Sequence, residues 1–245
     1  MANQSLIEWT DATWNPWHGC IKVSPGCKHC YMYRDKKRYG QEANNVVKSK
    51  TTFHDPLKWT VPRLIFTCSW SDWFIEEADE WRSEAWQVIR ETPHHTYQIL
   101  TKRPERIIGN LPDDWEDGWS NVWLGVSIET KEFLLRKEFL TQVPACVRFI
   151  SAEPLLGPLD LGVLSKIHWI ITGGESGPKA RHMNLDWVRG IRRQCIRASV
   201  PFFHKQNGGN KRIDSAWGGR ILDGRTWDEI PQIPIPSIAE QPCPP

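Results

Sequence analysis

The sequence lacks the features that mark several special classes of protein. Its 245 residues contain no apolar run approaching about 18 residues, the length that a membrane-spanning helix needs. Residues 1–9 have neither the basic region nor the apolar region of a secretory signal. No repeat with a period of about 20–50 residues is present, which argues against a solenoid or a propeller. We therefore expect a cytoplasmic protein that makes no membrane contact.

A large excess of charge of one sign is also missing. Lys and Arg number 31, Asp and Glu number 29, and the formal net charge is +2. Such a balance gives little general attraction to nucleic acid, although basic residues gather locally within 28–38, 102–106 and 189–197. Hydrophobic residues make up 40% and charged residues 24%, which is typical of a folded globular chain and excludes a disordered or collagen-like one.

The middle of the chain alternates short apolar runs with segments of helical periodicity. The apolar runs predict six strands and a weaker first one, at 63–68, 96–100, 121–127, 147–151, 167–172, 201–204 and 6–9. Spacings of three and four predict a helix at 76–91. We also expect a helix at 31–39, after the cysteine loop, and two more that begin after the N-cap residues Thr130 and Asn184.

This alternation predicts an α/β fold with a parallel sheet. We expect a partial (β/α)6-type parallel barrel over residues 1–206, with a doubly wound open sheet as the alternative topology. Residues 207–245 are rich in Gly and Pro and predict an irregular C-terminal extension packed on the barrel. We expect the chain to be a monomer.

Polar residues follow nearly every predicted strand. The clusters are Ser69/Ser71/Asp72, Thr101/Lys102/Arg103, Ser127/Glu129, Ser151/Glu153, Gly173/Gly174/Glu175 and Lys205/Gln206. Polar loops and helix caps would explain some of them. In a parallel barrel, however, the carboxyl ends of all strands meet at the end that holds the active site. Because Glu153 precedes a proline and Glu175 follows two glycines, neither is placed as a cap, and we predict catalytic roles for Glu153, Glu175 and Lys102.

Three of the seven cysteines lie on one loop, residues 14–31. Cys20, Cys27 and Cys30 follow the spacing C-x6-C-x2-C, and three thiolates on one loop can converge on a soft metal centre. A structural zinc ion would need a fourth ligand, for which His18 and His29 are candidates. A disulfide with one spare thiol is a third alternative. The loop follows the first predicted strand, at the end of the barrel that carries the polar clusters, and this position favours a catalytic iron–sulfur cluster.

The cysteine loop resembles that of radical S-adenosylmethionine (SAM) enzymes. Those enzymes carry C-x3-C-x2-C after the first strand of a partial barrel. Here Cys27-Lys-His29-Cys30 fits the second half of the motif, with His29 in the place of an aromatic residue, while the first gap is six residues long. Over roughly residues 9–207 the chain also resembles the phage Gp37/Gp68-like, three-Cys-motif family, through WNPWHGC (14–20), SAEPLLG (151–157), GGESG (173–177) and VPFFHKQ (200–206).

The resemblance implies an enzyme with two cofactors. A [4Fe–4S] cluster on Cys20, Cys27 and Cys30 would bind SAM, with His29 beside it, and would cleave it reductively to a 5′-deoxyadenosyl radical. An electron donor such as a flavodoxin-type reductant would be the partner. The substrate is not identified, and a nucleotide or nucleic acid is one candidate.

The resemblance also assigns contacts to SAM. Ser69, Ser71 and Asp72 correspond to the strand end that binds the amino group, where the usual Gly-Gly-Glu motif is replaced by Ser-Trp-Ser-Asp. Ser127 or Glu129 corresponds to the ribose contact. Lys102 or Arg103 would hold the carboxylate or an anionic substrate.

Two alternative functions remain open from the sequence. One is a non-catalytic zinc- or nucleic-acid-binding module built around the cysteine loop. The other is a hydrolase that uses Glu153 and Glu175 as a pair of carboxylates.

Overall fold

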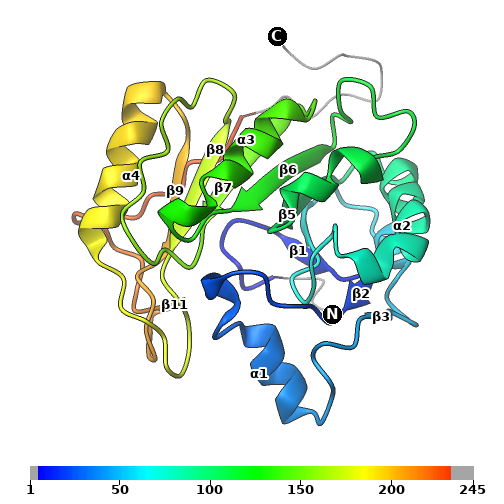
Figure 1. Ribbon diagram of the computed structural model, residues 1–245, viewed down its shortest axis with the longest axis horizontal. Helices are drawn as coiled ribbons and strands as arrows, with labels where there is room; N and C mark the ends of the chain where they lie inside the picture. Colours follow the sequence, from blue (N-terminus) through cyan, green and yellow to red (C-terminus); the bar gives the residue numbers. More distant parts are fainter. Residues whose placement is uncertain (1–4, 233–245) are drawn as a thin grey trace.

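The centre of the molecule is a seven-stranded parallel sheet that curls into a half-barrel (Figure 1). The computed structural model describes residues 5–232. The strands follow one another in chain order: β1 (Ala12–Trp14), β4 (Leu64–Thr67), β5 (Thr96–Thr101), β6 (Val122–Ser127), β7 (Val147–Ala152), β8 (Trp169–Gly173) and β9 (Phe202–Gln206). This order confirms the predicted partial parallel barrel and differs from a doubly wound sheet, in which the strand order reverses at a switch point.

Four α-helices accompany the sheet, α1 (Tyr31–Arg38), α2 (Asp79–Glu91), α3 (Leu135–Gln142) and α4 (Leu185–Ala198). Helix α1 projects away from the sheet below the cysteine loop, and α3 lies against β6 and β7 (Figure 1). Two small antiparallel pairs are formed by β2 (Trp17–His18) with β3 (Val47–Lys48) and by β10 (Arg212–Ile213) with β11 (Ala216–Trp217). The 3-10 turns are η1 (Pro25–Cys27), η2 (Asp55–Lys58), η3 (Glu76–Ala78), η4 (Pro104–Arg106), η5 (Ile108–Asn110) and η6 (Lys131–Phe133).

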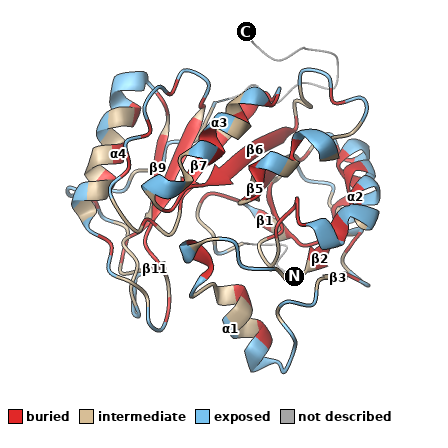
Figure 2. Cartoon of the chain, in the orientation of Figure 1, coloured by how far each residue is buried: buried red, intermediate tan, exposed pale blue. Residues whose placement is uncertain are grey.

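The side chains of the strands alternate between two apolar clusters, as the period of two in a β-strand requires. On the convex face, strand residues such as Ile65, Leu124 and Ile150 pack with Val88 of α2 and Ile191 of α4. The concave face carries a separate, mainly aromatic cluster of Trp9, Phe66, Trp123, Val147, Phe149, Trp169, Ile171 and Phe203. Figure 2 shows the result, with the strands buried and the outer faces of the helices exposed.

The predicted first strand at 6–9 is wrong, because the strand that begins the sheet is β1. Trp9 instead packs into the concave face of the half-barrel, where it is 2% exposed. Its ring centroid lies 4.7 Å from that of Phe66 and 6.1 Å from that of Trp169. A large aromatic side chain gains more by filling this open side of the sheet than by pairing at its edge.

The two predicted N-caps differ in their outcome. The Asn184 side chain accepts a hydrogen bond from the backbone N–H of Asp186 at 2.8 Å, as expected. Thr130 has the extended backbone of an N-cap, but its side chain makes no capping hydrogen bond. The chain after Thr130 forms η6 before α3 begins, so the tighter turn satisfies part of the backbone that a cap would serve.

The described part of the C-terminal extension lies along β9. The backbone of Phe203 pairs antiparallel with that of Asp228, and His204 N–H donates to the carbonyl of Trp227 at 2.8 Å. The rings of Phe202 and Trp227 meet at 6.0 Å between centroids. These contacts cover the edge strand of the sheet; residues 233–245 lie outside the described part of the chain.

The length and hydropathy of the helices can be compared with those of a membrane-spanning helix. Among the helices formed by residues 5–232, none is both long and apolar enough to cross a membrane.

Candidate functional site

A cavity of about 620 Å³ lies at the carboxyl ends of the parallel strands. Its volume falls within the range of about 300–1,000 Å³ that is usual for small-molecule sites. The predicted site residues that line it are Cys20, Cys27, His29, Cys30, Ser69, Ser71, Asp72, Lys102, Ser127, Glu153 and Glu175. The parallel sheet therefore brings together all the predicted site residues except Glu129, because each lies at the carboxyl end of a strand or on the cysteine loop.

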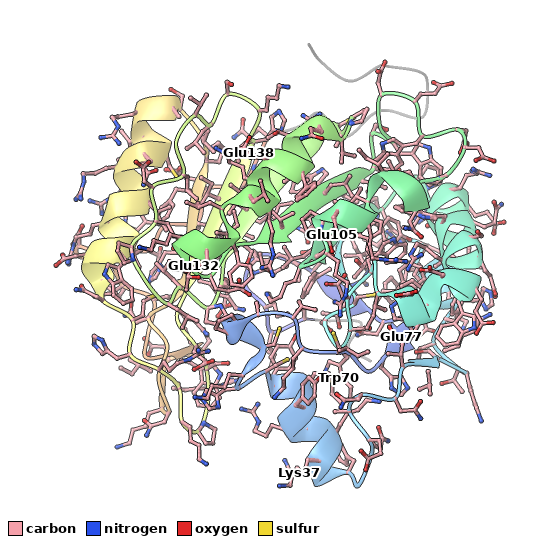
Figure 3. The ribbon with its side chains drawn as sticks, in the orientation of Figure 1. Lys37, Trp70, Glu77, Glu105, Glu132 and Glu138 are labelled. Carbon is pink, nitrogen blue, oxygen red and sulfur yellow. The ribbon has the colours of Figure 1, made fainter. Side chains whose placement is uncertain are left out.

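The cysteine loop is held against the strand ends by hydrogen bonds of Gly19. Gly19 N–H donates to the carbonyl of Trp70 at 3.0 Å, and the Ser71 hydroxyl donates to the carbonyl of Gly19 at 2.6 Å. Figure 3 labels Trp70 beside this loop. Gly19 has a φ of +103°, and a Cβ there would lie 2.2 Å from the carbonyl oxygen of Asn45, so the loop requires glycine at this position. The hydroxyl of Tyr33, on α1, donates to the carbonyl of Cys20.

Cys20, Cys27 and Cys30 are free thiols, which differs from the disulfide alternative. Burial raises the pKa of Cys20 to about 12, and it also raises the pKa of Cys30. The charge of Cys27 adds to both shifts, so the three sulfur atoms interact electrostatically. Cys20 and Cys30 are therefore protonated thiols at neutral pH.

The donor set fits an iron–sulfur cluster in its chemistry. Three thiols on one wall of one cavity are the ligands that such clusters take. Across residues 5–232, no group of three or more His, Cys, Asp or Glu side chains is arranged to hold a metal ion as it stands. The fit to an iron–sulfur cluster therefore rests on the three thiol ligands and on their position in one cavity.

Asp72 is buried and almost fully occupied by protein donors. Its Oδ1 accepts hydrogen bonds from the Thr101 hydroxyl at 2.6 Å and from Phe74 N–H at 3.0 Å. Its Oδ2 accepts from Lys102 N–H at 2.9 Å and lies 3.2 Å from the Arg103 guanidinium. Asp72 therefore fixes the chain that carries Lys102 and Arg103 while it also lines the cavity.

The three predicted serines also have partners within the protein. Ser69 Oγ exchanges hydrogen bonds with the Asn15 side chain at 3.0 and 3.3 Å. Ser71 holds Gly19, as described above. Ser127 is buried at the end of β6, and its carbonyl accepts a hydrogen bond from Arg136 at 2.8 Å. Ser69 and Ser127 both line the cavity.

Glu129 does not line the cavity, in contrast to the other predicted ligands of SAM. The side chain is completely buried, and Oε1 accepts a hydrogen bond from the Ser24 hydroxyl at 2.7 Å and lies 3.1 Å from Lys102 Nζ. Oε2 accepts from Arg136 at 2.9 Å. Burial alone would raise the pKa of the Glu129 carboxyl, but Lys102, Arg136 and Ser24 hold it below its usual value. Glu129 thus joins the cysteine loop to the end of β6.

A substitution at Gly26 tests this connection. A Cβ at Gly26 would lie 2.4 Å from Glu129 Oε1, so the loop can approach the carboxylate only with glycine at this position. We expect Gly26→Ala to lower the free energy of unfolding by about 1–3 kcal/mol, the usual range for overpacking. Chemical denaturation measures the change. Gly157→Ala is the control, since no atom lies within 4 Å of a Cβ there, and equal stabilities of the two variants would contradict the predicted crowding.

Glu175 is held by an arginine that the sequence analysis did not identify. Its Oε2 accepts from the backbone N–H and from Nε of Arg181, both at 2.9 Å, and its Oε1 pairs with the other end of the guanidinium. Burial acts to raise the pKa of Glu175, but the bonds from Arg181 and the nearby His29 lower it. Glu175 is therefore an ionised carboxylate on the cavity wall.

Glu153 and its neighbour Ser151 differ from these occupied groups. Glu153 Oε2 lies 3.3 Å from Lys205 Nζ, whereas its Oε1 is buried and has no hydrogen-bond partner among the described residues. The hydroxyl of Ser151, which is 1% exposed, also lacks a partner there. Both residues line the cavity.

Sequence reasoning missed three residues that organise the site. Arg181 and Arg136 hold Glu175 and Glu129, and Ser24 reaches Glu129 across 105 positions of the chain. Arg136 lies on α3 and Arg181 on a loop, and the sequence around an arginine at such a position does not indicate which carboxylate it binds. Ser24 and Glu129 are far apart in the chain, and the contacts of Arg181 and Arg136 depend on how the loops between the elements fold, so a sequence motif does not reveal them.

Comparison with known proteins gives a family and no activity. The family model described as "Protein of unknown function (DUF5131)" matches residues 4–231. No curated protein and no solved structure matches the chain.

Proposed function

The chain belongs to the DUF5131 family, and for it we propose a radical SAM-type enzyme activity. The observation that carries the proposal is the shared cavity: three free thiols of one loop face the polar strand ends of a parallel half-barrel. The likeness of the loop to radical SAM enzymes and of the chain to the phage Gp37/Gp68-like family supports it. A zinc- or nucleic-acid-binding module would not need glutamates and lysines from four other strands in the same cavity.

Cys20, Cys27 and Cys30 would hold the [4Fe–4S] cluster. When bound, the cluster would supply the electron for reductive cleavage of SAM to methionine and a 5′-deoxyadenosyl radical, which would take a hydrogen atom from the substrate. The protein supplies binding, orientation and exclusion of water. The electron donor, of a flavodoxin type, and a nucleotide or nucleic-acid substrate are parts of the same proposal.

Residues of this chain have separate roles in holding SAM. Lys102 and Arg103 supply the positive charge that the carboxylate of SAM requires, and Asp72 holds both in place. Ser69 and His29 offer polar atoms to the amino group, and Ser127 offers a hydroxyl to the ribose. Because Glu129 is enclosed beneath the loop, we assign it the positioning of Lys102 and of the loop.

Formation of 5′-deoxyadenosine tests the proposed activity. The chain is purified without oxygen, loaded with iron and sulfide, and incubated with SAM and dithionite. We expect 5′-deoxyadenosine and methionine in equal amounts, measured by mass spectrometry, and neither product without the cluster. A chain that holds about four iron atoms and yields no 5′-deoxyadenosine would contradict the proposal. A colourless chain with one tightly bound zinc ion would support the zinc module instead.

A further inference from the structure

Two residues near the end of β7 each carry a buried polar atom that has no hydrogen-bond partner among the described residues. Ser151 lies in β7, on the concave face that also carries Phe149, and Glu153 is the first residue after the strand. The Ser151 hydroxyl and Glu153 Oε1 are both buried and lack hydrogen-bond partners within residues 5–232. Both residues line the 620 Å³ cavity.

Buried polar atoms of this kind lower the stability of the folded protein unless a ligand or water forms a hydrogen bond with them. A buried polar group without a hydrogen bond destabilises a protein by about 1–3 kcal/mol. The neighbouring strand leaves room for this arrangement: a Cβ at Gly173 would lie 2.9 Å from Glu153 Oε1. The position of the carboxylate thus depends on a glycine, and Glu153 also lines the cavity, which can admit a ligand.

The charge around the two atoms selects an uncharged ligand group. Lys205 Nζ lies 3.3 Å from Glu153 Oε2, so the carboxylate already has a cation. Because Lys205 already compensates the charge of the carboxylate, Oε1 needs only a hydrogen-bond donor. A neutral N–H or O–H group of a ligand meets that need.

The aromatic residues that line the cavity favour a flat ring. Trp9, Phe66 and Leu100 line the same cavity from the concave face, and Trp217 lines it from the C-terminal extension. Aromatic rings stack readily on aromatic side chains, and bases taken out of a helix are read by such stacking together with hydrogen bonds to their edges.

We propose that Ser151 and Glu153 bind the N–H edge of an uncharged planar heterocycle, of the nucleobase type, in the substrate. Glu153 Oε1 accepts from the ring N–H or amino group, and the Ser151 hydroxyl supplies the second hydrogen bond. The inference deepens the proposed function, because it names the class of substrate for the same cavity. The binding itself requires neither reductant nor cleavage of SAM.

Nucleoside binding by the full chain tests the proposal. Guanosine and cytidine, which carry adjacent N–H donors and acceptors, are titrated by calorimetry without reductant. Ribose and 1,3-dimethyluracil, a ring without N–H donors, are the comparison ligands. We expect at least one nucleoside to bind, at least about tenfold weaker binding to Glu153→Gln, and about threefold to tenfold weaker binding to Ser151→Ala, the losses usual for a buried hydrogen bond. Glu105→Gln, an exposed position outside the cavity, should not change the affinity.

Thermal unfolding separates a binding role from a structural one. Because the Ser151 hydroxyl has no partner in the described chain, Ser151→Ala should leave the melting temperature unchanged or raise it. A lowered melting temperature with unchanged nucleoside binding would overturn the proposal.

Three binding results would overturn the proposal as well. They are the absence of nucleoside binding at millimolar concentration, equal binding of 1,3-dimethyluracil or ribose, and an equal loss of affinity for SAM in Glu153→Gln, which would assign the two residues to SAM. The absence of 5′-deoxyadenosine, with nucleoside binding intact, would contradict only the proposed activity.

Discussion

Replacing Cys20, Cys27 and Cys30 together by Ala is expected to remove all bound iron and all visible colour from the anaerobically purified protein. The wild-type chain should be brown and hold about four iron atoms, as a [4Fe–4S] cluster requires. The three thiols lie on one wall of the cavity, so their removal leaves the cluster without protein ligands there. Iron and sulfide analysis together with the visible absorption spectrum measures the effect.

The control for this experiment is another buried thiol. Cys195 is free, completely buried and part of the convex apolar cluster, far along the chain from the loop. Cys195→Ala should retain the iron and the colour while losing some stability. Persistence of the colour in the triple variant would show that the ligands of the cluster have been misassigned. Loss of the colour in Cys195→Ala alone would point to unfolding instead of lost ligands.

Replacing Glu129 by Leu is expected to lower the free energy of unfolding at pH 7 by about 3–5 kcal/mol, the range seen when one partner of a buried ion pair is removed. The carboxylate faces Lys102 and Arg136 and accepts the hydroxyl of Ser24. Its loss leaves the buried Arg136 guanidinium without its anionic partner. The same change frees the cysteine loop from the end of β6. Urea denaturation measures the stability, and Glu105→Leu, at an exposed position, is the control.

The effect of Glu129 should depend on pH in one direction. Its folded-state pKa lies below the usual 4.5 of a glutamate, so unfolding binds a proton as the pH falls. The stabilisation is therefore fully present above pH 4.5 and is lost as the pH falls through the lower, folded-state pKa. The difference in stability between wild type and Glu129→Leu should be constant from pH 7 to about pH 5 and should shrink below pH 4.5. A difference that grows on acidification would contradict the assigned ion pairs.

Most strands of the sheet could be predicted from the local pattern of apolar residues in the sequence. Strands β4 to β9 each coincide with a predicted apolar run, because a buried parallel strand needs a short stretch of apolar residues whatever surrounds it. The prediction of a strand at 6–9 was wrong because it rested on the same kind of pattern. Leu6-Ile-Glu-Trp9 has the composition of a strand, but Trp9 is buried in the concave face of the half-barrel without forming one. A run of apolar residues predicts that the segment is buried, but it does not predict whether the segment is a strand, a helix or a loop.

The sequence by itself determined the kinds of groups in the cavity. A polar cluster after each strand and three cysteines on one loop could be read directly, because parallel strands point their carboxyl ends the same way. What each group contacts was decided by the tertiary structure. Glu129 meets Ser24 across 105 positions, Lys205 meets Glu153 across 52, and Ser151 and Glu153 Oε1 meet no partner in the described chain. Hydrogen bonds depend on distances of about 3 Å between atoms, and such distances between remote parts of a chain exist only once the sheet has curled and the loop has closed over its strand ends.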